Sequence, residues 1–385
     1  MKRWKKIFLL FETICIVFLF TGCFNYREIE RNTIVAGMAI DKGTGGYKYH
    51  MTFETLSLGG GKDQSAKSVL LASDGNTIFD CVRNSVTMAD KKLYFSDSKV
   101  IIISKELAQE GIKPLLDFFL RDAEPRITMN MLVSDEDTAA DILKVKVQTN
   151  EPVSYKISGM LEQTEKSQGH VLPTPLFQSY NILSSGSQDL TLPNVRVVKL
   201  GESSEPQVTT NIIFKGDKMA GYMPDDECLY YLILKNKIAS GILLTGFKGL
   251  ERDISLEIQK CSAKIEPTVD GNNVTMKIQI QMDASLGEEQ NSNQKYTVGN
   301  GEFESIEKVA DETIKEGTEN LISDVQKNFG TDIFGFGTAI NKNKYGEWEK
   351  ISKDWGKIFP NVKCEVTADV KVLNSATAFP KGGEK

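Results

Sequence analysis

The fold of the second half is decided by residues 254–282, which read ISLEIQKCSAKIEPTVDGNNVTMKIQIQM. In the first arm Ile254, Leu256 and Ile258 alternate with polar residues, and Asp270-Gly271-Asn272-Asn273 then supplies turn chemistry. In the second arm every other residue is again apolar, namely Val274, Met276, Ile278, Ile280 and Met282. Strict alternation places apolar side chains on one face of a strand. The stretch therefore predicts a long antiparallel pair with one buried face.

A long helix and a final strand follow this pair. Apolar positions line one side of a helix from about Glu302 to Asn328, and alternation returns in a strand over Val362–Leu373. The helix face comprises Ile306, Val309, Thr313, Leu321 and Val325, and the buried strand face comprises Val362, Cys364, Val366, Ala368, Val370 and Val372. We predict a C-terminal α+β domain over residues 206–380, with a mainly antiparallel sheet backed by the long helix.

The start of that domain carries turn and capping signals. Strands are predicted at Asn211–Lys215 and Lys218–Tyr222, joined by a turn at Gly216-Asp217. A helix capped by Asp225 or Asp226 is expected to continue through Ala239.

The first part of the chain alternates predicted strands with predicted helices. Thr33–Ile40 and Tyr47–Leu58 favour a hairpin, and Asn76–Asp90 favours a helix because Ile78, Val82, Val86 and Ala89 share one face. The pattern continues with a strand at Leu93–Ile103, a Ser104-capped helix at Lys105–Arg121 divided by Gly111 and Pro114, a strand at Ile127–Val133, and a helix beginning at Ser134 and ending near Leu143. This order predicts a mixed α/β N-terminal domain over residues 23–143.

Between residues 144 and 205 the signals weaken. A helix is predicted at Ser154–Lys166, followed by loops around Pro173, Pro175 and Pro193. Gly201–Pro206 is the strongest linker candidate, so 144–205 is predicted to be a connector or middle subdomain. The fold class that follows is a multidomain α+β protein of two to three domains.

Composition limits the class of protein. The chain has 385 residues with 40% hydrophobic and 25% charged residues, which are values typical of folded, water-soluble domains. The formal net charge is −6, and four basic residues against one acid in the first 22 leave the remainder more acidic still. An acidic body repels phosphate backbones, so nucleic-acid binding is not expected.

The first 23 residues predict the compartment. Met1–Lys6 is basic, Ile7–Phe20 is mostly apolar but contains Glu12, and Phe20-Thr21-Gly22-Cys23 ends in two small residues before a cysteine. This is the pattern of a lipoprotein signal peptide over residues 1–22, with a diacylglycerol and further acyl chains such as palmitate attached to Cys23. This run of 14 residues, with Glu12 inside it, is shorter than the stretch of about 20 apolar residues that a spanning helix needs. The alternative is an ordinary cleaved signal that leaves Cys23 free.

Few residues suggest catalysis or metal binding. The two histidines, His50 and His170, are far apart in sequence. Ser96 and Lys99 match Ser-x-x-Lys, but the predicted strand there would point them apart. The six cysteines form no Cys-x-x-Cys pair, although a bridge among Cys81, Cys228, Cys261 and Cys364 stays open. We expect no enzyme, no metal and no cofactor beyond the lipid on Cys23.

Several segments resemble one family in their order along the chain. The first are Cys23–Glu30 (CFNYREIE) and Ile34–Asp41 (IVAGMAID), followed by Val100–Ala108 and Asp117–Asp122 with Arg126. Later segments are Phe214–Tyr222 (FKGDKMAGY) and Asp332–Gly337 (DIFGFG), with Trp348 and Trp355 downstream. The set resembles the C-subunit lipoproteins of spore germinant receptors, the Ger(x)C family. Ser98 departs from the pattern, since the family often has histidine there.

The resemblance implies a non-catalytic receptor subunit needed for the germination response. It implies a three-domain α/β lipoprotein on the outer surface of the spore inner membrane, acting with an A subunit and a permease-like B subunit on small nutrients; direct contact of this subunit with a nutrient stays open. Tyr26, Arg27 and Glu28 lie just beyond the anchor, so they either contact membrane-embedded partners or form a short tether. The alternative function is an extracytoplasmic substrate-binding lipoprotein of a transporter, which would need two similar doubly wound domains.

Overall fold

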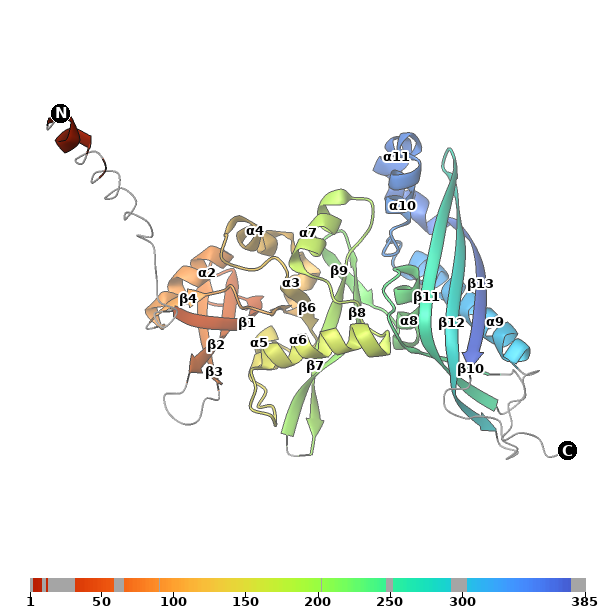
Figure 1. Cartoon of the computed structure of the whole chain (residues 1–385), viewed down its shortest axis with the longest axis horizontal. Helices are drawn as coiled ribbons and strands as arrows, with labels where there is room; N and C mark the ends of the chain where they lie inside the picture. The colour runs from red at the N-terminus through yellow and green to blue at the C-terminus, as the bar shows by residue number, and fades with distance from the viewer. Residues whose placement is uncertain are drawn as a thin grey trace.

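A computed structural model describes residues 3–8, 12, 32–58, 66–89, 91–201, 203–246, 252–291 and 303–374. Two units built on separate sheets lie side by side along the long axis of the molecule (Figure 1). The predicted multidomain α+β class is confirmed.

The first unit is a nine-stranded mixed sheet in the order β3-β2-β1-β5-β6-β7-β8-β9, with β4 paired to β1. The strands β1, β5, β6 and β7 run parallel, and antiparallel strands extend both ends. Their bounds are β1 Asn32–Lys42, β2 Tyr49–Leu58, β3 Ala66–Gly75, β4 Lys92–Tyr94, β5 Val100–Ile103, β6 Asn130–Ser134, β7 Thr191–Leu200, β8 Ser203–Lys215 and β9 Lys218–Tyr222.

Helices cover both faces of the middle of this sheet. One face packs against α2 (Ile78–Asn84), α3 (Lys105–Glu110), α4 (Lys113–Arg121) and α7 (Leu176–Ser185), and the other against α5 (Ala139–Leu143) and α6 (Val153–Gln163). Neighbouring residues therefore join different cores: Ile101 packs with the first helix group and Ile102 with the second. A parallel strand buried on both faces needs an unbroken apolar run, as β5 has in Val-Ile-Ile-Ile.

Two buried carboxylates fasten the second helix layer to the sheet. Asp41 of β1 accepts hydrogen bonds from the backbone N–H groups of Ala139 (2.6 Å) and Ala140 (3.0 Å) at the start of α5. Glu54 of β2 accepts from Val153 and Ser154, both at 2.8 Å, at the start of α6. Each carboxylate satisfies helix N–H groups that have no partner within the helix.

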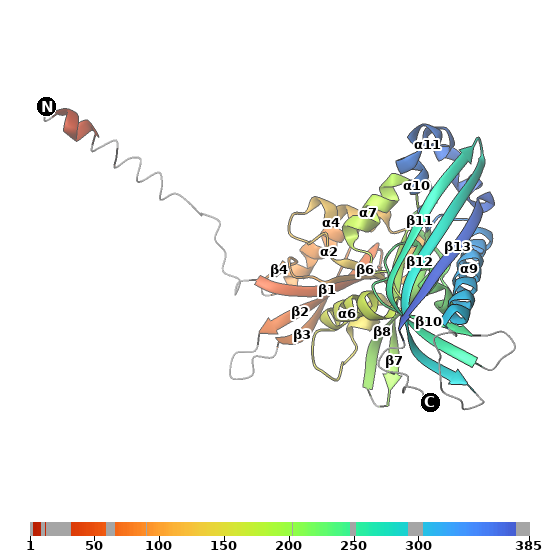
Figure 2. The ribbon, with the colours of Figure 1, turned by 45° about the vertical axis from the view of Figure 1, so that its right-hand side comes forward.

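The second unit is a four-stranded sheet in the order β10-β11-β12-β13, with a long helix along one face (Figure 2). The bounds are β10 Ile242–Gly246, β11 Arg252–Asp270, β12 Asn273–Asn291, β13 Lys363–Asn374 and helix α9 Phe303–Asn328. The predicted antiparallel pair, the helix and the final strand are confirmed. The sheet is mainly antiparallel, but β13 runs parallel to β12 because α9 carries the chain back across the sheet before β13 begins.

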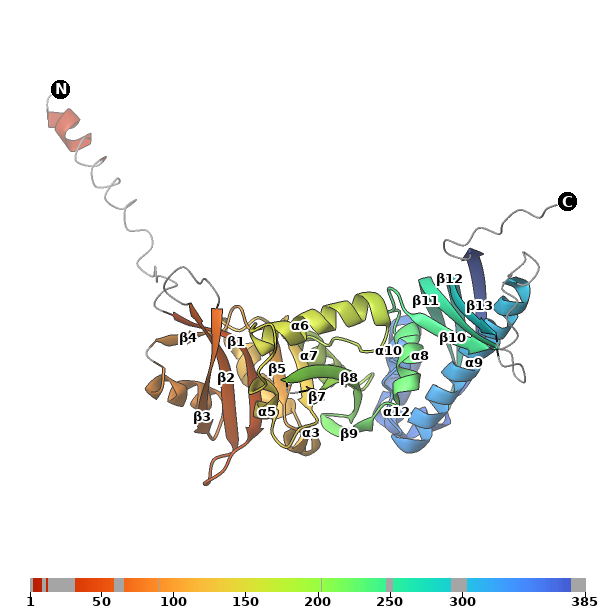
Figure 3. The same ribbon diagram turned by 90° about the horizontal axis from the view of Figure 1, so that it is seen from below.

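Short helices connect the two units. They are η4 (Asp225–Glu227) with α8 (Cys228–Leu234) before the second sheet, and α10 (Phe336–Asn343), α11 (Tyr345–Ile351) and α12 (Trp355–Ile358) between α9 and β13. Seen from below, α8 lies between β8 and the second sheet (Figure 3). The predicted helix through Ala239 ends earlier, at Leu234, because Asn236 adopts a positive φ of 53°. Neither Asp225 nor Asp226 caps it with its side chain.

Several predicted elements of the first unit are wrong. The strand at Leu93–Ile103 is two strands, β4 and β5, because a turn at Ser96-Asp97 separates them; β4 pairs with residues 32–34 of β1 and β5 with residues 37–40. The predicted helix over Asn76–Asp90 is shorter: α2 covers Ile78–Asn84, and Val86 is exposed. The cap of α5 is Thr138 rather than Ser134, since Thr138 and Asp141 form a reciprocal capping box.

The predicted connector is part of the first sheet. The segments around Pro175 and Pro193, expected as loops, are α7 and β7. Of the linker candidate Gly201–Pro206, residues 203–206 belong to β8, and Glu202 lies outside the described residues. The predicted domain boundaries at 143/144 and 205/206 both fall within the segment of chain that forms the first sheet, and the second boundary lies inside β8. The physical reason is packing, because Val195 of β7 completes the core beneath α5 and α6.

Candidate functional site

The predicted lipid site and partner contacts lie outside the described residues. These are Cys23, Tyr26, Arg27 and Glu28; the next described residue is Asn32, which begins β1. Within the described ranges, no helix is long and apolar enough to cross a membrane.

The candidate catalytic residues are held apart by ordinary structural contacts. His50 Nδ1 lies 2.9 Å from Asp74 Oδ1, whereas His170 Nε2 lies 4.0 Å from Asp225. Ser96 donates to the backbone oxygen of Glu124, while Lys99 forms an ion pair with Asp97 at 2.8 Å. The structure therefore brings neither a histidine to a nucleophile nor Lys99 to Ser96.

The cysteines of the described chain are free thiols. Cys81, Cys228, Cys261 and Cys364 form no disulfide with one another, so the bridge left open by their spacing is absent among these four. Burial raises the pKa of the Cys228 thiol, and burial raises the pKa of Cys81 to about 12. A thiol that stays protonated is a weak nucleophile and a poor metal ligand. No group of three or more His, Cys, Asp or Glu side chains suited to a metal occurs in the part that the structure describes.

The most constrained polar arrangement lies at the junction of the two units, in residues 331–337, which we name the Asp332 loop. The Asp332 carboxylate is 1% exposed. It accepts hydrogen bonds from the backbone N–H groups of Gly335 (2.9 Å), Phe336 (3.1 Å) and Gly337 (2.8 Å), and from Trp355 Nε1 at 3.1 Å. Burial raises the pKa of Asp332, while the three backbone donors act in the opposite direction by stabilising the anion.

Two glycines make this loop possible. Gly335 has a φ of 85°, a left-handed conformation that glycine adopts without steric cost. A Cβ on Gly337 would lie 2.5 Å from the backbone oxygen of Ser187 and 2.8 Å from atoms of both Trp348 and Trp355. The two tryptophans pack edge to face with ring centroids 5.6 Å apart. The segment Asp332–Gly337 and the two downstream tryptophans, which carried part of the sequence resemblance, are thus one packed structure.

The Asp332 loop is bound to the first sheet through Asp189. The backbone N–H of Asp189 donates to the backbone oxygen of Asp332 at 2.7 Å, and the N–H of Asp332 donates to Asp189 Oδ2 at 3.0 Å. The other carboxylate oxygen of Asp189 accepts from Gly216 N at 2.8 Å, at the turn between β8 and β9. Lys235 Nζ lies 3.3 Å from the backbone oxygens of Ile333 and Phe334, and burial lowers the pKa of Lys235.

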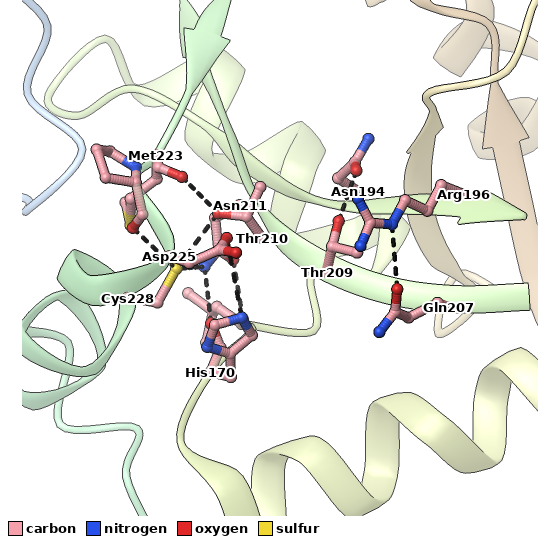
Figure 4. Close-up of polar contacts among 12 residues, drawn as sticks. His170, Asn194, Arg196, Gln207, Thr209, Thr210, Asn211, Met223, Asp225 and Cys228 are labelled. Carbon is pink, nitrogen blue, oxygen red and sulfur yellow. Dashed lines mark hydrogen bonds and ion pairs between the residues drawn. The ribbon is translucent and has the colours of Figure 1, made fainter. Parts of the chain in front are cut away.

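A second polar cluster joins β8 to α8 (Figure 4). Asn211 accepts from Leu172 N at 3.0 Å, donates to the backbone oxygen of His170 at 3.2 Å, and lies 3.6 Å from Cys228 Sγ. Thr210 donates to the backbone oxygen of Met223 at 2.6 Å. Cysteine, histidine and asparagine are therefore close together, but the His170 ring pairs with Asp225 rather than with the thiol.

Strand β8 is the wall that the two units share. Ile212 and Phe214 point into the core of the first sheet, whereas Ile213 packs into the core that contains α8, β11 and β12. Asp189 and Asn211 add hydrogen bonds from this region to Asp332 and to Cys228 of α8, so the two units are joined by polar as well as apolar contacts. The side-chain hydrogen-bonding groups of Asp332, Asp189 and Asn211 described above bind partners within the protein. These residues therefore act by holding segments of the fold in place.

No role was predicted from the sequence for Asp189, Asn211, Asp41 or Glu54. Asp41 and Asp332 do belong to segments that carry the family resemblance, Ile34–Asp41 and Asp332–Gly337. Asp189, Asn211 and Glu54 belong to none of those segments. All of these residues become important because a segment distant in sequence packs against them.

Comparisons with known proteins agree across the whole length. The family model of the Spore germination protein N-terminal domain matches residues 25–197, and the model described as Spore germination B3/GerAC like, C-terminal, matches residues 210–376. The chain is 24% identical to spore germination protein KC of Bacillus subtilis (strain 168), over 96% of this chain and 95% of that protein. It is 22% identical to spore germination protein B3 of the same strain, over 97% and 98% respectively.

A solved structure has the same fold. The crystal structure of the GerBC protein superposes with a TM-score of 0.57 and 19% sequence identity, covering 88% of this chain and 97% of that one. The interval between the two family matches falls within β7 and β8, at the wall shared by the two units.

Proposed function

The chain belongs to the Spore germination B3/GerAC-like family, and from that premise we propose that it is the lipid-anchored, non-catalytic subunit of a nutrient germinant receptor. In this proposal Cys23 carries the lipid and holds the protein on the outer surface of the spore inner membrane. Its partners are the membrane-embedded A and B subunits, and its loss abolishes the response to at least one nutrient.

The observation that carries the proposal is the position of the first family match. It begins at residue 25, directly after the predicted lipidation cysteine, and the second match ends at residue 376. The family match therefore follows the predicted leader almost immediately. A protein attached by two or more acyl chains remains stably on a membrane without a spanning helix.

The two units also differ too much to favour a transporter's substrate-binding lipoprotein. That function was expected to need two similar doubly wound domains. The first unit has a nine-stranded mixed sheet covered on both faces, and the second a four-stranded sheet backed by one long helix. The junction between them is filled by the contacts of Asp189, Asn211 and Asp332.

Fatty-acid labelling tests the attachment. In the parent organism, wild type should incorporate labelled fatty acid and fractionate with the membrane, whereas Cys23→Ala should do neither. Cys15→Ala is the matched control, because it removes a cysteine from the same leader and should leave the label unchanged. Equal labelling of wild type and Cys23→Ala would end the lipid proposal.

Germination tests the receptor role. Spores lacking the gene should lose the response to at least one nutrient, measured as the fall in optical density after nutrient addition. Spores that carry Cys23→Ala should show the same defect if attachment is required. A deletion strain that responds normally to every nutrient tested would refute the receptor role.

A further inference from the structure

We propose that the end of the first sheet at which β1 begins lies against an anionic lipid bilayer, through exposed apolar and basic residues of the segments before β4 and β6 and of the start of α7. This inference rests on the proposed lipid attachment at Cys23 and adds a second contact, which fixes the orientation of the body. We name this surface the β1 end and define it by Val86, Met88, Lys91, Arg126, Ile127 and Phe177.

Strand topology places these residues at one end of the molecule. The strands β4 and β5 both pair parallel to β1, and β6 pairs parallel to β5, so all four strands run in the same direction and begin toward the same end of the sheet. Val86, Met88 and Lys91 precede β4, and Arg126 and Ile127 precede β6.

Direct contacts tie the two segments together. Lys92, the first residue of β4, forms an ion pair with Glu124 at 2.9 Å, and Glu124 lies three residues before Ile127. The backbone N–H of Phe177, at the start of α7, donates to the backbone oxygen of Ile127 at 3.0 Å. The β1 end is therefore formed by neighbouring segments rather than by scattered ones.

The side chains there are unusually apolar for exposed positions. Met88 is 63% exposed, Val86 and Ile127 are each 49% exposed, and Phe177 is 40% exposed. Moving such a side chain from water into an apolar environment is favourable. Exposed apolar residues that gather at one end of a protein mark a surface that meets a membrane or a partner.

Charge and tether length favour a lipid surface. Lys91 and Arg126 are exposed close in sequence to Met88 and Ile127, and basic residues are attracted to the negative surface of an anionic bilayer. Asn32 follows Cys23 by nine residues, which span at most roughly 30 Å when extended. A tether this short keeps the β1 end near the lipid that holds Cys23, so even weak contacts are populated.

Site-specific photo-crosslinking tests the inference. A photoreactive amino acid is placed at Met88 or Ile127 of the full lipidated chain, which is reconstituted in vesicles of phosphatidylglycerol and phosphatidylethanolamine. The matched control is Leu244 of β10, which is 69% exposed but lies on the second unit. We expect lipid adducts at 88 and 127 to exceed those at 244 several-fold, with unchanged thermal stability.

The other outcomes are informative. Equal lipid adducts at all three positions, or none at 88 and 127, would overturn the proposal, and so would protein adducts in place of lipid adducts when the experiment is repeated in native spore membranes. Equal yields of lipid adducts in anionic vesicles and in neutral phosphatidylcholine vesicles would overturn the proposed attraction of Lys91 and Arg126 to anionic lipid. Crosslinking is measured only on protein whose fatty-acid label has been verified. Loss of the label counts against lipid attachment at Cys23. Loss of the lipid adducts while the label is retained counts against the membrane contact of the β1 end.

Discussion

The two sheets bury their strands in different ways. All four residues of β5 in the first sheet are buried, because helices cover both faces. In β12 of the second sheet Ile278 and Ile280 are buried while Gln279 and Gln281 are exposed, because α9 covers one face only. The number of covered faces, rather than strand propensity, therefore sets the residue pattern of a strand.

The largest expected effect is at the contact on which both sheets depend. Asp332→Ala removes the acceptor of three backbone N–H groups and of Trp355 Nε1, all buried. We expect a loss of roughly 3–5 kcal/mol in the free energy of unfolding. Chemical denaturation should also change from one transition to two, as the second unit unfolds first. Asp354→Ala, which removes an exposed ion pair with Lys357, is the control and should change little. A single, unshifted transition for Asp332→Ala would show that the units do not depend on this loop.

The next effect measures the contrast between the sheets directly. Ile101 and Ile102 point into opposite cores of the first sheet. Ile101→Ala and Ile102→Ala should therefore each lower the free energy of unfolding by about 2–5 kcal/mol. In the second sheet Ile280→Ala should cost a similar amount, but its neighbour Gln281→Ala should stay within about 0.5 kcal/mol of wild type. Urea denaturation of the four variants gives these values. The contrast fails if one of the two β5 variants is neutral or if Gln281→Ala is as costly as Ile280→Ala.

A smaller effect is expected from crowding the junction. In Gly337→Ala the new methyl group would meet Ser187, Trp348 and Trp355, so we expect a loss of about 1–3 kcal/mol. Gly346→Ala in α11 has open space around its Cβ and should gain up to about 1 kcal/mol from helix propensity. Thermal unfolding followed by tryptophan fluorescence reports both variants. A less stable Gly337→Ala together with a more stable Gly346→Ala would support the close packing around Gly337, whereas two stabilised variants would contradict it.

The smallest effect is a pH dependence confined to the second unit. Burial raises the pKa of Glu227 from its ordinary 4.5 to about 7, helped by a hydrogen bond to Asp324 of α9 and by the charges of Asp324 and Asp226. A raised carboxyl pKa means that the folded state holds a proton that the unfolded chain releases. The stability it contributes is complete below pH 4.5 and is lost as the pH rises through about 7.

Glu227→Gln should remove this dependence. The amide stays neutral, so at pH 8 the variant should be more stable than wild type by roughly 1 kcal/mol, and the two should converge at pH 4. Glu312→Gln, at an exposed position of the same α9, is the control and should follow wild type at every pH. If the free energy of unfolding changes with pH in the same way for wild type and Glu227→Gln, the raised pKa of Glu227 is excluded as the cause of the pH dependence.

The second unit could be predicted from sequence more completely than the first. Alternation over residues 254–282 has a period of two and is unambiguous, and the helix over 303–328 is long enough to show its apolar face. In the first unit the strand predicted over Leu93–Ile103 joins two separate strands, β4 and β5, because they lie close together in the sequence and the local pattern does not reveal the turn at Ser96-Asp97 between them. Strand β7 was missed since it contains Pro193, which is tolerated at a register shift between Pro193 and Val195.

The sequence by itself determined what depends on neighbours along the chain: the apolar periods of the second sheet and α9, the Ser104 cap of α3, and the family segments from Cys23 to Trp355. Tertiary structure alone decided which distant groups meet. Asp41 and Glu54 bind helices that begin roughly a hundred residues later, and Asp189 meets Asp332 across 143 positions. A buried polar group is stable only beside a matching partner, and that partner is supplied by the packing of the whole chain rather than by its local pattern.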